Sequence, residues 1–240
     1  MRISLFLLAL VACVALSAER LNFSIRYIGI KVADVTIDDV RHDGGGRLMV
    51  MARSTGIARH MVQLDNTYES AYSGEYLPDT YSKRVHQKNY EEDRVTTYYR
   101  DTGTARRVSH LNPARNRQYH IDTNVRDFFT ALYYIRNAPA DEGELLLDAA
   151  GTIWRARYRV LSRENVRTGI GRIAARKVEF TFEQVDGGNN ERSDTLTSNL
   201  VTRGDPLHFW FSDDDRCLPV RASFRMRPFP VQWVLEGIQP

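Results

Sequence analysis

The stretch from His208 to Met226, HFWFSDDDRCLPVRASFRM, decides the fold class because it joins two alternating apolar runs through three aspartates. In the first run the apolar residues are Leu207, Phe209 and Phe211, and His208, Trp210 and Ser212 face the other way. In the second run the apolar residues are Leu218, Val220, Ala222, Phe224 and Met226. Apolar side chains at every second position indicate strands with one buried face. The stretch therefore predicts two neighbouring β-strands.

Asp213, Asp214 and Asp215 separate the two runs and predict the turn between them. Short acidic side chains tolerate turn dihedrals and accept hydrogen bonds from their own backbone. Pro219 opens the second run and cannot donate a hydrogen bond to a neighbouring strand. We therefore expect a β-hairpin whose second strand either lies at a sheet edge or carries a bulge at Pro219.

Residues 1–18, MRISLFLLALVACVALSA, combine a positive charge at Arg2 with an almost unbroken apolar run that ends in small residues. The run is shorter than the roughly twenty residues that span a bilayer. The pattern predicts a secretory signal peptide cleaved after Ser17 or Ala18, followed by a single domain over residues 19–240 without a transmembrane span. Because residues 10–13 also resemble a bacterial lipoprotein box, an anchor through Cys13 is the alternative.

The mature chain is long enough for one sizeable core, and its charge is nearly balanced. The whole sequence has 33 Lys and Arg against 30 Asp and Glu, a formal net charge of +3. So small a charge predicts no nucleic-acid partner. After cleavage Cys217 is the one remaining cysteine, so no internal disulfide is expected. An exported chain without a disulfide fits the bacterial periplasm better than a eukaryotic secreted protein.

Most of the mature chain alternates with period two and breaks at turn residues, as antiparallel strands do. The expected strands lie in residues 21–40, 48–52, 63–72, 79–86, 94–100 and 104–111. Turn signals occur at Gly29, Asp43–Gly46 and Asp101–Gly103. Residues 186–194, DGGNNERSD, are expected to form a polar loop.

Two further expected strands, residues 153–160 and 177–183, flank a turn that we centre on Ile170. This register predicts that Tyr158 faces Phe182, which leaves the apolar side chains of both strands on one face. The opposite face carries Arg155, Arg157 and Arg159 together with Glu179 and Glu183. Pairing between these charges is favoured over a phosphate-binding stripe.

Residues 124–136, NVRDFFTALYYIR, break the strand pattern and predict the one clear helix. Its apolar face consists of Val125, Phe128, Phe129, Leu132 and Ile135, at helical spacing. Asn124 is the expected N-cap, and Pro139 follows the expected end. So apolar a face must be buried, and a curved sheet is the natural partner.

The chain contains candidates for chemistry but no catalytic motif. The surface of most interest comprises Asp213, Asp214 and Asp215 with Trp210 and His208 nearby. Carboxylates bind calcium, although three adjacent residues on a tight turn rarely converge on one ion. Cys217 has no base near it in sequence and is expected to be a buried thiol. We therefore predict no catalytic, cofactor-binding or metal-binding residue.

The segment from Arg100 to His120 interleaves arginines with tyrosines, among them Arg106, Arg107, Arg115 and Arg117. Such a pattern is used to stack on single-stranded nucleic acid, which export argues against. A basic surface for acidic lipid or polysaccharide is the alternative, and the role of the segment stays open.

Three blocks of sequence, in this order, resemble the exported bacterial proteins of domain-of-unknown-function family 3108. They are LNFSIRYIGIKVADVTID at 21–38, DFFTALYYIRN at 127–137 and FWFSDDDRCLPVRASF at 209–224. Residues 160–180, VLSRENVRTGIGRIAARKVEF, are similar to the strand-turn-strand of that family. The resemblance covers nearly all of the mature chain and implies an exported, β-rich protein. Because the family has no assigned activity, the resemblance implies no catalytic residue.

The expected architecture is mainly β: a long, curved antiparallel sheet or open β-barrel, packed on one short helix at about 124–136. It looks like the half-barrel lipoprotein carriers of the bacterial envelope, although a shared fold does not establish a shared function. A curved sheet with more apolar inner surface than one helix covers leaves a cleft for apolar ligands.

The first functional hypothesis is therefore a periplasmic, non-enzymatic binding or scaffold protein for a lipid-like or cell-envelope component. The first alternative is an enzyme that acts on envelope polysaccharide through paired carboxylates drawn from the aspartate turn. The second alternative is a partner-binding module whose edge strand at Pro219 receives another protein.

Overall fold

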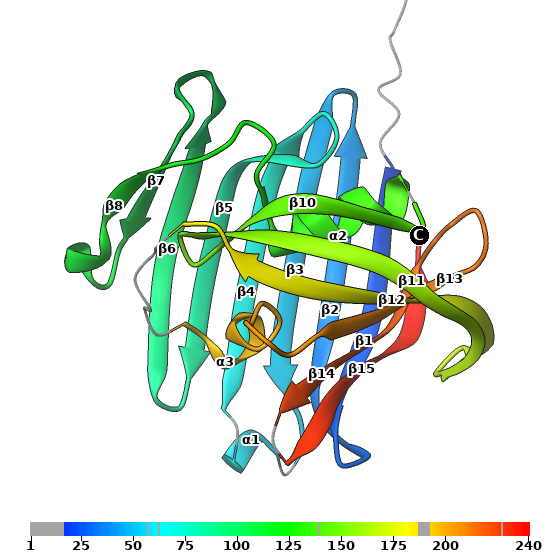
Figure 1. The fold of residues 1–240 in the computed structure, drawn as a ribbon. Coiled ribbons are helices and arrows are strands. Elements are labelled where there is room, and N and C mark those ends of the chain that lie inside the picture. Colours follow the sequence, from blue (N-terminus) through cyan, green and yellow to red (C-terminus); the bar gives the residue numbers. More distant parts are fainter. Residues whose placement is uncertain (1–16, 57, 62, 139, 187–192, 227) are drawn as a thin grey trace, which may run out of the picture.

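A computed structural model describes residues 17–240 except 57, 62, 139, 187–192 and 227. Cys13 and all but the last two residues of the expected signal peptide lie outside the described residues. The described residues form a single 15-stranded sheet that coils around a central helix (Figure 1). No helix in this part of the chain is long and apolar enough to cross a membrane.

The first eight strands follow one another across the sheet as an antiparallel meander. They are β1 (Ser17–Tyr27), β2 (Ile30–His42), β3 (Gly45–Ser54), β4 (Leu64–Ser73), β5 (Leu77–Gln87), β6 (Tyr90–Tyr99), β7 (Thr104–Ser109) and β8 (Arg117–His120). The short helix α1 (Ala58–Met61) connects β3 to β4, and 3-10 turns at Arg100–Thr102 and Pro113–Arg115 flank β7.

After β8 the chain crosses to the opposite edge of the sheet and returns strand by strand to β1. The strands of this half are β9 (Arg126–Asp127), β10 (Glu142–Ala149), β11 (Thr152–Thr168), β12 (Gly171–Gln184), β13 (Leu207–Ser212), β14 (Pro219–Met226) and β15 (Phe229–Gln239). β9 and β10 are parallel, and the other neighbours are antiparallel. The first and last strands therefore lie side by side in the middle of the sheet.

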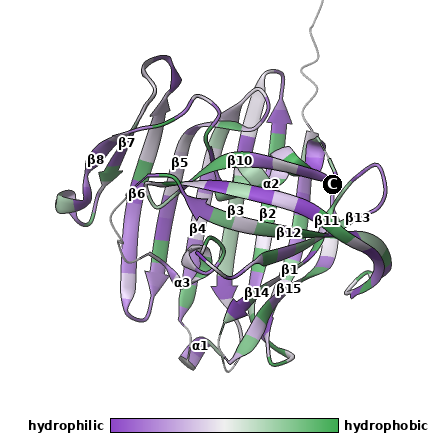
Figure 2. Ribbon diagram, in the orientation of Figure 1, coloured by the Kyte–Doolittle hydropathy of each residue, from purple (hydrophilic) through white to green (hydrophobic). Residues whose placement is uncertain are grey.

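The strands form where the sequence alternates, and hydrophilic and hydrophobic residues alternate along them in Figure 2. In β3, for example, Leu48, Val50 and Ala52 are buried and the residues between them are not. One face of the sheet thus lines the interior, because period-two side chains point alternately to the two faces. The predicted mainly-β fold with an open, curved sheet is confirmed.

β13 and β14 form the predicted hairpin, with Phe209 opposite Ala222. The register shifts next to Phe211, which pairs with Pro219. Pro219 therefore lies at a bulge, where its missing N–H is tolerated. The edge-strand alternative is wrong, because β14 also pairs with β15. From Arg221 to Met226, β14 is therefore an inner strand of the sheet.

The β11–β12 hairpin keeps the predicted faces but not the predicted register. Tyr158 pairs with Phe180, not with Phe182. The turn consists of Gly169 and Ile170 alone, and Leu161 forms a bulge; each feature shifts the pairing by one residue. A total shift of two residues leaves every side chain on its expected face, which explains why the pattern did not reveal the error.

The predicted helix is present as α2 (Phe128–Asn137), but it begins later than expected. Its N-cap is Asp127, whose carboxylate accepts hydrogen bonds from the N–H groups of Phe129 (2.9 Å) and Thr130 (3.1 Å). Asn124 is not the cap, because residues 126–127 are extended and pair with β10 as strand β9.

The helix α2 is enclosed between the two halves of the sheet (Figure 1). On one side the ring of Phe129 lies 5.3 Å from that of Tyr68 on β4. On the other side the ring of Phe128 lies 6.4 Å from that of Phe209 on β13. The helix is therefore buried on most of its circumference, and even Arg136 in its last turn is covered and paired with a carboxylate. The prediction of one apolar stripe was too narrow.

Candidate ligand-binding site

The interior of the coiled sheet is mostly apolar along one half and contains more polar side chains along the other. The strands β1–β3 and β13–β15 present apolar side chains such as Ile25, Val35 and Phe209. The buried polar and charged side chains of β4–β7 include Asn66, Ser70, Lys83, Gln87, Glu92, Arg94, Thr96 and Arg107. Burial of such groups is costly unless they find partners. The polar half is therefore where internal pairing or a ligand must satisfy them.

The short helix α3 (Thr195–Ser198) lies in this interior and separates two cavities. Leu196 and Asn199 line an apolar cavity on one side of it. Thr197 and Ser198 line a polar cavity on the other side.

The apolar cavity has a volume of about 470 Å³. Its buried walls include Ile25, Ala33, Leu64, Leu196, Phe224 and Val231, which come from five strands and α3. Cavities of roughly 300–1,000 Å³ with mostly apolar walls are typical small-molecule sites. The volume and the lining both suit an apolar ligand.

The mouth of the apolar cavity has a polar rim on the side of the β5–β6 turn. The rim residues Gln63, Lys88 and Asn89 are exposed, whereas the walls are buried. A ligand therefore reaches the apolar walls past side chains that are in contact with water.

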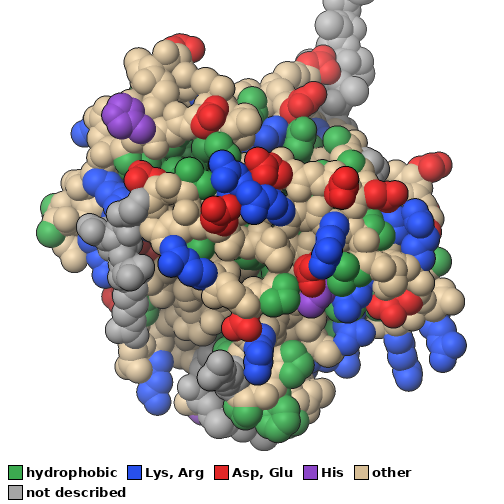
Figure 3. Space-filling model, viewed as in Figure 1, with side chains coloured by type: hydrophobic (Ala, Val, Ile, Leu, Met, Phe, Trp, Pro, Cys, Tyr) green, Lys and Arg blue, Asp and Glu red, His purple; other side chains and the backbone are tan. Residues whose placement is uncertain are grey.

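Large apolar side chains are exposed beside this mouth, at the tips of two hairpins. Ile28 is 58%, Ile30 68% and Phe229 49% exposed. Phe229 packs edge to face against Tyr27, a residue of the cavity lining, at 6.4 Å between ring centroids. In Figure 3 hydrophobic side chains gather at this lower end of the molecule, where Figure 1 shows α1 and the β14–β15 turn.

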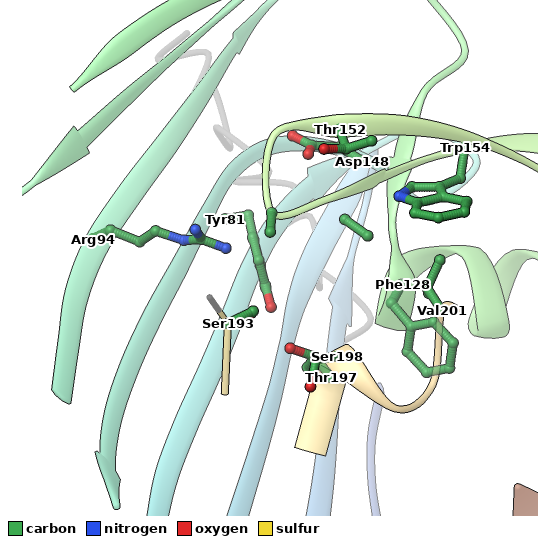
Figure 4. A pocket seen from close by; sticks show the side chains of 12 residues that line it. Tyr81, Arg94, Phe128, Asp148, Thr152, Trp154, Ser193, Thr197, Ser198 and Val201 are labelled. Atoms are coloured by element: carbon green, nitrogen blue, oxygen red, sulfur yellow. The ribbon is translucent and has the colours of Figure 1, made fainter. Parts of the chain in front are cut away.

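The polar cavity has a volume of about 260 Å³ and lies on the far side of α3. Figure 4 shows Tyr81 and Arg94 reaching toward it from β5 and β6, across from Trp154 and Phe128. The guanidinium of Arg94 is 3.1 Å from Glu92, and its Nε has no hydrogen-bond partner among the residues that the structure describes.

Asp148 closes one side of the polar cavity and is fully engaged by donors. It accepts hydrogen bonds from the hydroxyls of Tyr98 (3.1 Å) and Tyr119 and from the N–H of Gly151 (2.7 Å). Burial, reinforced by this carboxylate, raises the pKa values of both tyrosines well above their usual range. The group thus ties the β10–β11 turn to β6 and β8.

A buried ionic cluster anchors α3 to the sheet. Lys83 Nζ lies 2.6 Å from Asp194 and 3.2 Å from Glu92, and the side chains of Lys83 and Asp194 are at most 1% exposed. Burial raises the pKa of Asp194, but Lys83 and hydrogen bonds from Thr197 and Tyr68 bring it down to about 2. Asp194 also caps α3 through two of its backbone N–H groups, both at 2.9 Å.

Asp194 ends the stretch 186–194 that we expected to form a polar loop, and the described residues 186, 193 and 194 do lie outside helices and strands. Residues 187–192 lie outside the described chain, but Asp194 is completely buried. Its charge belongs to the interior because Lys83 and the N-terminus of α3 meet it there.

Lys83 also donates a hydrogen bond to Ser193 Oγ at 2.8 Å, a pairing that some enzymes use to activate a serine nucleophile. Activation requires a neutral amine that accepts the hydroxyl proton. Burial lowers the pKa of Lys83, and the carboxylates of Asp194 and Glu92 beside it oppose that shift. The ion pairs of Lys83 with Asp194 and Glu92 and its hydrogen bond to Ser193 assign it to the support of α3.

The aspartates predicted as a surface of interest, Asp213–Asp215, lie on an exposed turn and line neither cavity. Asp214 accepts a hydrogen bond from Ser212 Oγ at 2.5 Å, as a turn residue does. Asp213 forms an ion pair with Arg163 at 3.3 Å. The structure thus does not bring them to a groove, which the polysaccharide-hydrolase alternative required.

Trp210 and His208 lie on the outer face of the sheet. Trp210 packs beneath the guanidinium of Arg221, 5.1 Å from its ring centroid, and its Nε1 donates a hydrogen bond to Glu164. His208 lies 3.5 Å from Glu179. These two residues support the packing of the β11–β12 hairpin and are apart from both cavities.

The outer arginines of β11 pair with glutamates, as the favoured interpretation of the pattern predicts. Arg157 contacts Glu144 and Glu183 at 3.1 and 3.2 Å, and Arg159 contacts Glu179 at 2.9 Å. Figure 3 shows basic and acidic side chains interspersed on the face that carries these strands.

The segment from Arg100 to His120 is less available to an acidic surface than its composition suggests. Arg107 is only 1% exposed, and its guanidinium donates to the backbone carbonyl of Arg115. Arg117 stacks over Tyr119, 5.0 Å from its ring centroid.

Cys217 is a buried, free thiol, as expected. Its Sγ accepts a hydrogen bond from Arg176 at 3.0 Å, and burial raises the pKa of the thiol. Across the described residues no group of three or more His, Cys, Asp or Glu is placed to hold a metal ion.

Sequence reasoning missed the polar residues of the interior, above all Lys83, Gln87 and Asp194. In β5 a signal was present, because Lys83 and Gln87 share the parity of the apolar residues Tyr81 and Val85. Polar residues at apolar positions of an alternating strand are candidates for an interior site.

The comparisons with known proteins identify a family and a fold. A family model described as "Protein of unknown function (DUF3108)" matches residues 22–228. The chain is similar to the crystal structure of a β-barrel-like protein of domain of unknown function DUF1849 from Brucella abortus, with a TM-score of 0.58 and 7% identity. That alignment covers 92% of this chain and 97% of the other.

A crystal structure with a YmcC-like fold from Bacteroides fragilis NCTC 9343 aligns over 92% of this chain and 95% of its own. Its identity is 9% and its TM-score 0.39. No curated protein matches the sequence. The similarity to the structure from Brucella abortus shows a shared fold.

Proposed function

We propose that this chain, which belongs to the family described as "Protein of unknown function (DUF3108)", is an exported envelope protein that binds a lipid-like molecule in its apolar cavity. The observation that carries the proposal is the cavity of about 470 Å³ between the sheet and α3, with a largely apolar wall. Burial of apolar ligand surface contributes about 25 cal/mol per Å². An acyl chain in this cavity would therefore bind without any reaction taking place.

The proposed location follows from the sequence pattern of residues 1–18. We infer export to the periplasm, with cleavage before Ala18 or Glu19. An intact mass spectrum of protein purified from its own host tests both parts of the proposal. A mature mass that starts at either residue, with a bound lipid in the native spectrum, is the expected result.

Binding itself is tested with the neutral, apolar dye N-phenyl-1-naphthylamine. We expect its fluorescence to rise with micromolar wild-type protein. Ala33 is 2% exposed and lines the cavity, so Ala33→Phe should place a ring in it and weaken dye binding at least tenfold. Ala71→Phe, the same change on the outer face of β4, is the matched control and should bind like the wild type.

Urea unfolding of both variants shows whether the fold is retained. A wild-type protein with clean mass spectra and no dye response contradicts the proposal. Equal dye binding by the folded Ala33 and Ala71 variants would place the dye elsewhere and contradict it as well.

A further inference from the structure

Gln87, the last residue of β5, is a polar side chain in the lining of the apolar cavity and is 9% exposed. Its Oε1 accepts hydrogen bonds from the backbone N–H of Thr195 (3.2 Å) and from Thr195 Oγ1 (3.1 Å). A backbone N–H only donates, so this contact fixes which end of the amide faces α3. The Nε2 group therefore faces away from α3.

This Nε2 is buried, and it has no hydrogen-bond partner within the described chain. Buried donors are nearly always paired, because an unpaired one loses its bonds to water without compensation. Its neighbours Leu64 across the ladder and Leu196 on α3 have no acceptor in their side chains, and none of the polar side chains of the lining, such as Ser54, bonds to Nε2. A ligand that enters the cavity with an acceptor atom would complete the amide.

We propose that the apolar cavity selects an amphiphile whose head carries a carbonyl oxygen, and that Gln87 Nε2 donates a hydrogen bond to that oxygen. This inference rests on the proposed function and names its ligand class. The carbonyl belongs either to the carboxylate of a free fatty acid or to the ester of an acyl chain.

The position of Gln87 sets the orientation of the bound molecule. Lys88 and Asn89 follow it directly and form part of the exposed rim. The head group therefore lies toward the mouth, and the chain extends toward walls such as Ile25 and Val231. The ammonium group of Lys88 at the rim favours a negatively charged head.

Displacement of N-phenyl-1-naphthylamine at pH 8 tests the inference with three twelve-carbon competitors. They are dodecanoate, methyl dodecanoate and dodecylamine, which share a chain and differ in the head. We expect dodecanoate to displace the dye at concentrations at least tenfold below those of dodecylamine, whose ammonium head accepts no hydrogen bond. If the methyl ester displaces the dye as well as dodecanoate does, the site accepts any acyl carbonyl. If the ester displaces the dye no better than dodecylamine, the site selects the carboxylate of a free fatty acid.

Gln87→Glu is the most specific variant. Its carboxylate still accepts hydrogen bonds from Thr195, but a second acceptor oxygen takes the place of the Nε2 donor. The preference for dodecanoate should then be lost while the dye still binds. Asn89→Asp makes the same chemical change at the exposed rim and should keep most of that preference. Gln87→Leu, which removes both ends of the amide, should also lose it.

The outcomes separate this inference from the proposed function. Equal binding of the three competitors by the wild type, as when a water molecule satisfies Nε2, overturns the inference and leaves lipid binding intact. Retention of the preference by folded Gln87→Glu overturns it too. Failure of the wild type to bind the dye at all overturns the proposed function itself.

Discussion

Asp127 joins three parts of the molecule through one carboxylate. It is completely buried and accepts four side-chain hydrogen bonds, two from backbone N–H groups of α2 and two from the hydroxyls of Thr130 and Ser70. Burial raises the pKa of Asp127, and these donors oppose the rise. The helix start is thereby tied to β4 and to β9.

Substitution of Asp127 should show how much of the fold depends on this cap. Asp127→Ala leaves two helix N–H groups and the hydroxyl of Ser70 without their acceptor, and we expect a loss of about 1–2 kcal/mol in the free energy of unfolding. Asp127→Asn keeps one accepting oxygen and no charge to bury, so its loss should be smaller. Urea unfolding measures both, and equal losses would contradict the assigned role.

The sequence predicts the helix but not its first residue, because two residues compete for the N-cap position. Both Asn124 and Asp127 are good N-cap residues, and local preference does not choose between them. The choice is made by pairing of residues 126–127 with β10, a contact that no local pattern contains. Gln87 shares the parity of the buried residues of β5, but its partner Thr195 is distant in sequence, so the local pattern does not show what it contacts.

At the scale of elements, α3 depends almost entirely on its surroundings. A helix of four residues is far below the length that is stable in isolation. It is held by the cap of Asp194, by the ion pair to Lys83 and by the buried side chain of Leu196. So short a segment has no detectable periodicity, which is why sequence reasoning found α2 and missed α3.

The pH dependence of stability should report on this anchor. Asp194 has a pKa of about 2 in the folded chain against an ordinary 3.8, so the unfolded chain binds more protons between these values. The free energy of unfolding should therefore fall as the pH is lowered from about 4 to about 2. Lys83→Met should remove this part of the slope and, at pH 7, cost about 3–5 kcal/mol, because it leaves the buried carboxylate of Asp194 without its cation.

Lys88→Met, a neighbouring and exposed position, serves as the control for Lys83→Met and should change stability by no more than about 0.5 kcal/mol. The double variant with Asp194→Asn should recover part of the loss. A small effect of Lys83→Met with an unchanged acid slope would contradict the anchoring role.

At the scale of the whole molecule, alternation along the chain was sufficient for the fold class and for most strands. It could not give the order of strands, in which the chain leaves one edge of the sheet after β8 and resumes at the other edge in β9. That crossover brings β9 and α2 into the interior and against the inner face of β4 and β5. The cavities follow from this coiling, so no local pattern contained them.

Amide hydrogen exchange should map the same architecture. β8 pairs on one side only, whereas β1 pairs with both β2 and β15 in the middle of the sheet. Local opening of an edge strand costs less free energy than opening of a central strand. The backbone amides of residues 117–120 should therefore exchange much faster than those of residues 21–25. Comparable protection of the two segments would contradict the described strand order.

The open sheet has one further consequence. In a closed barrel the girth is fixed by the number of strands and their stagger. Here the end strands β8 and β9 do not pair with each other within the described sheet, so no such seam fixes the girth. Side chains fasten the two edge regions to each other instead, because Tyr98 on β6 and Tyr119 on β8 donate to Asp148 on β10, and Ser70 on β4 donates to Asp127 on β9.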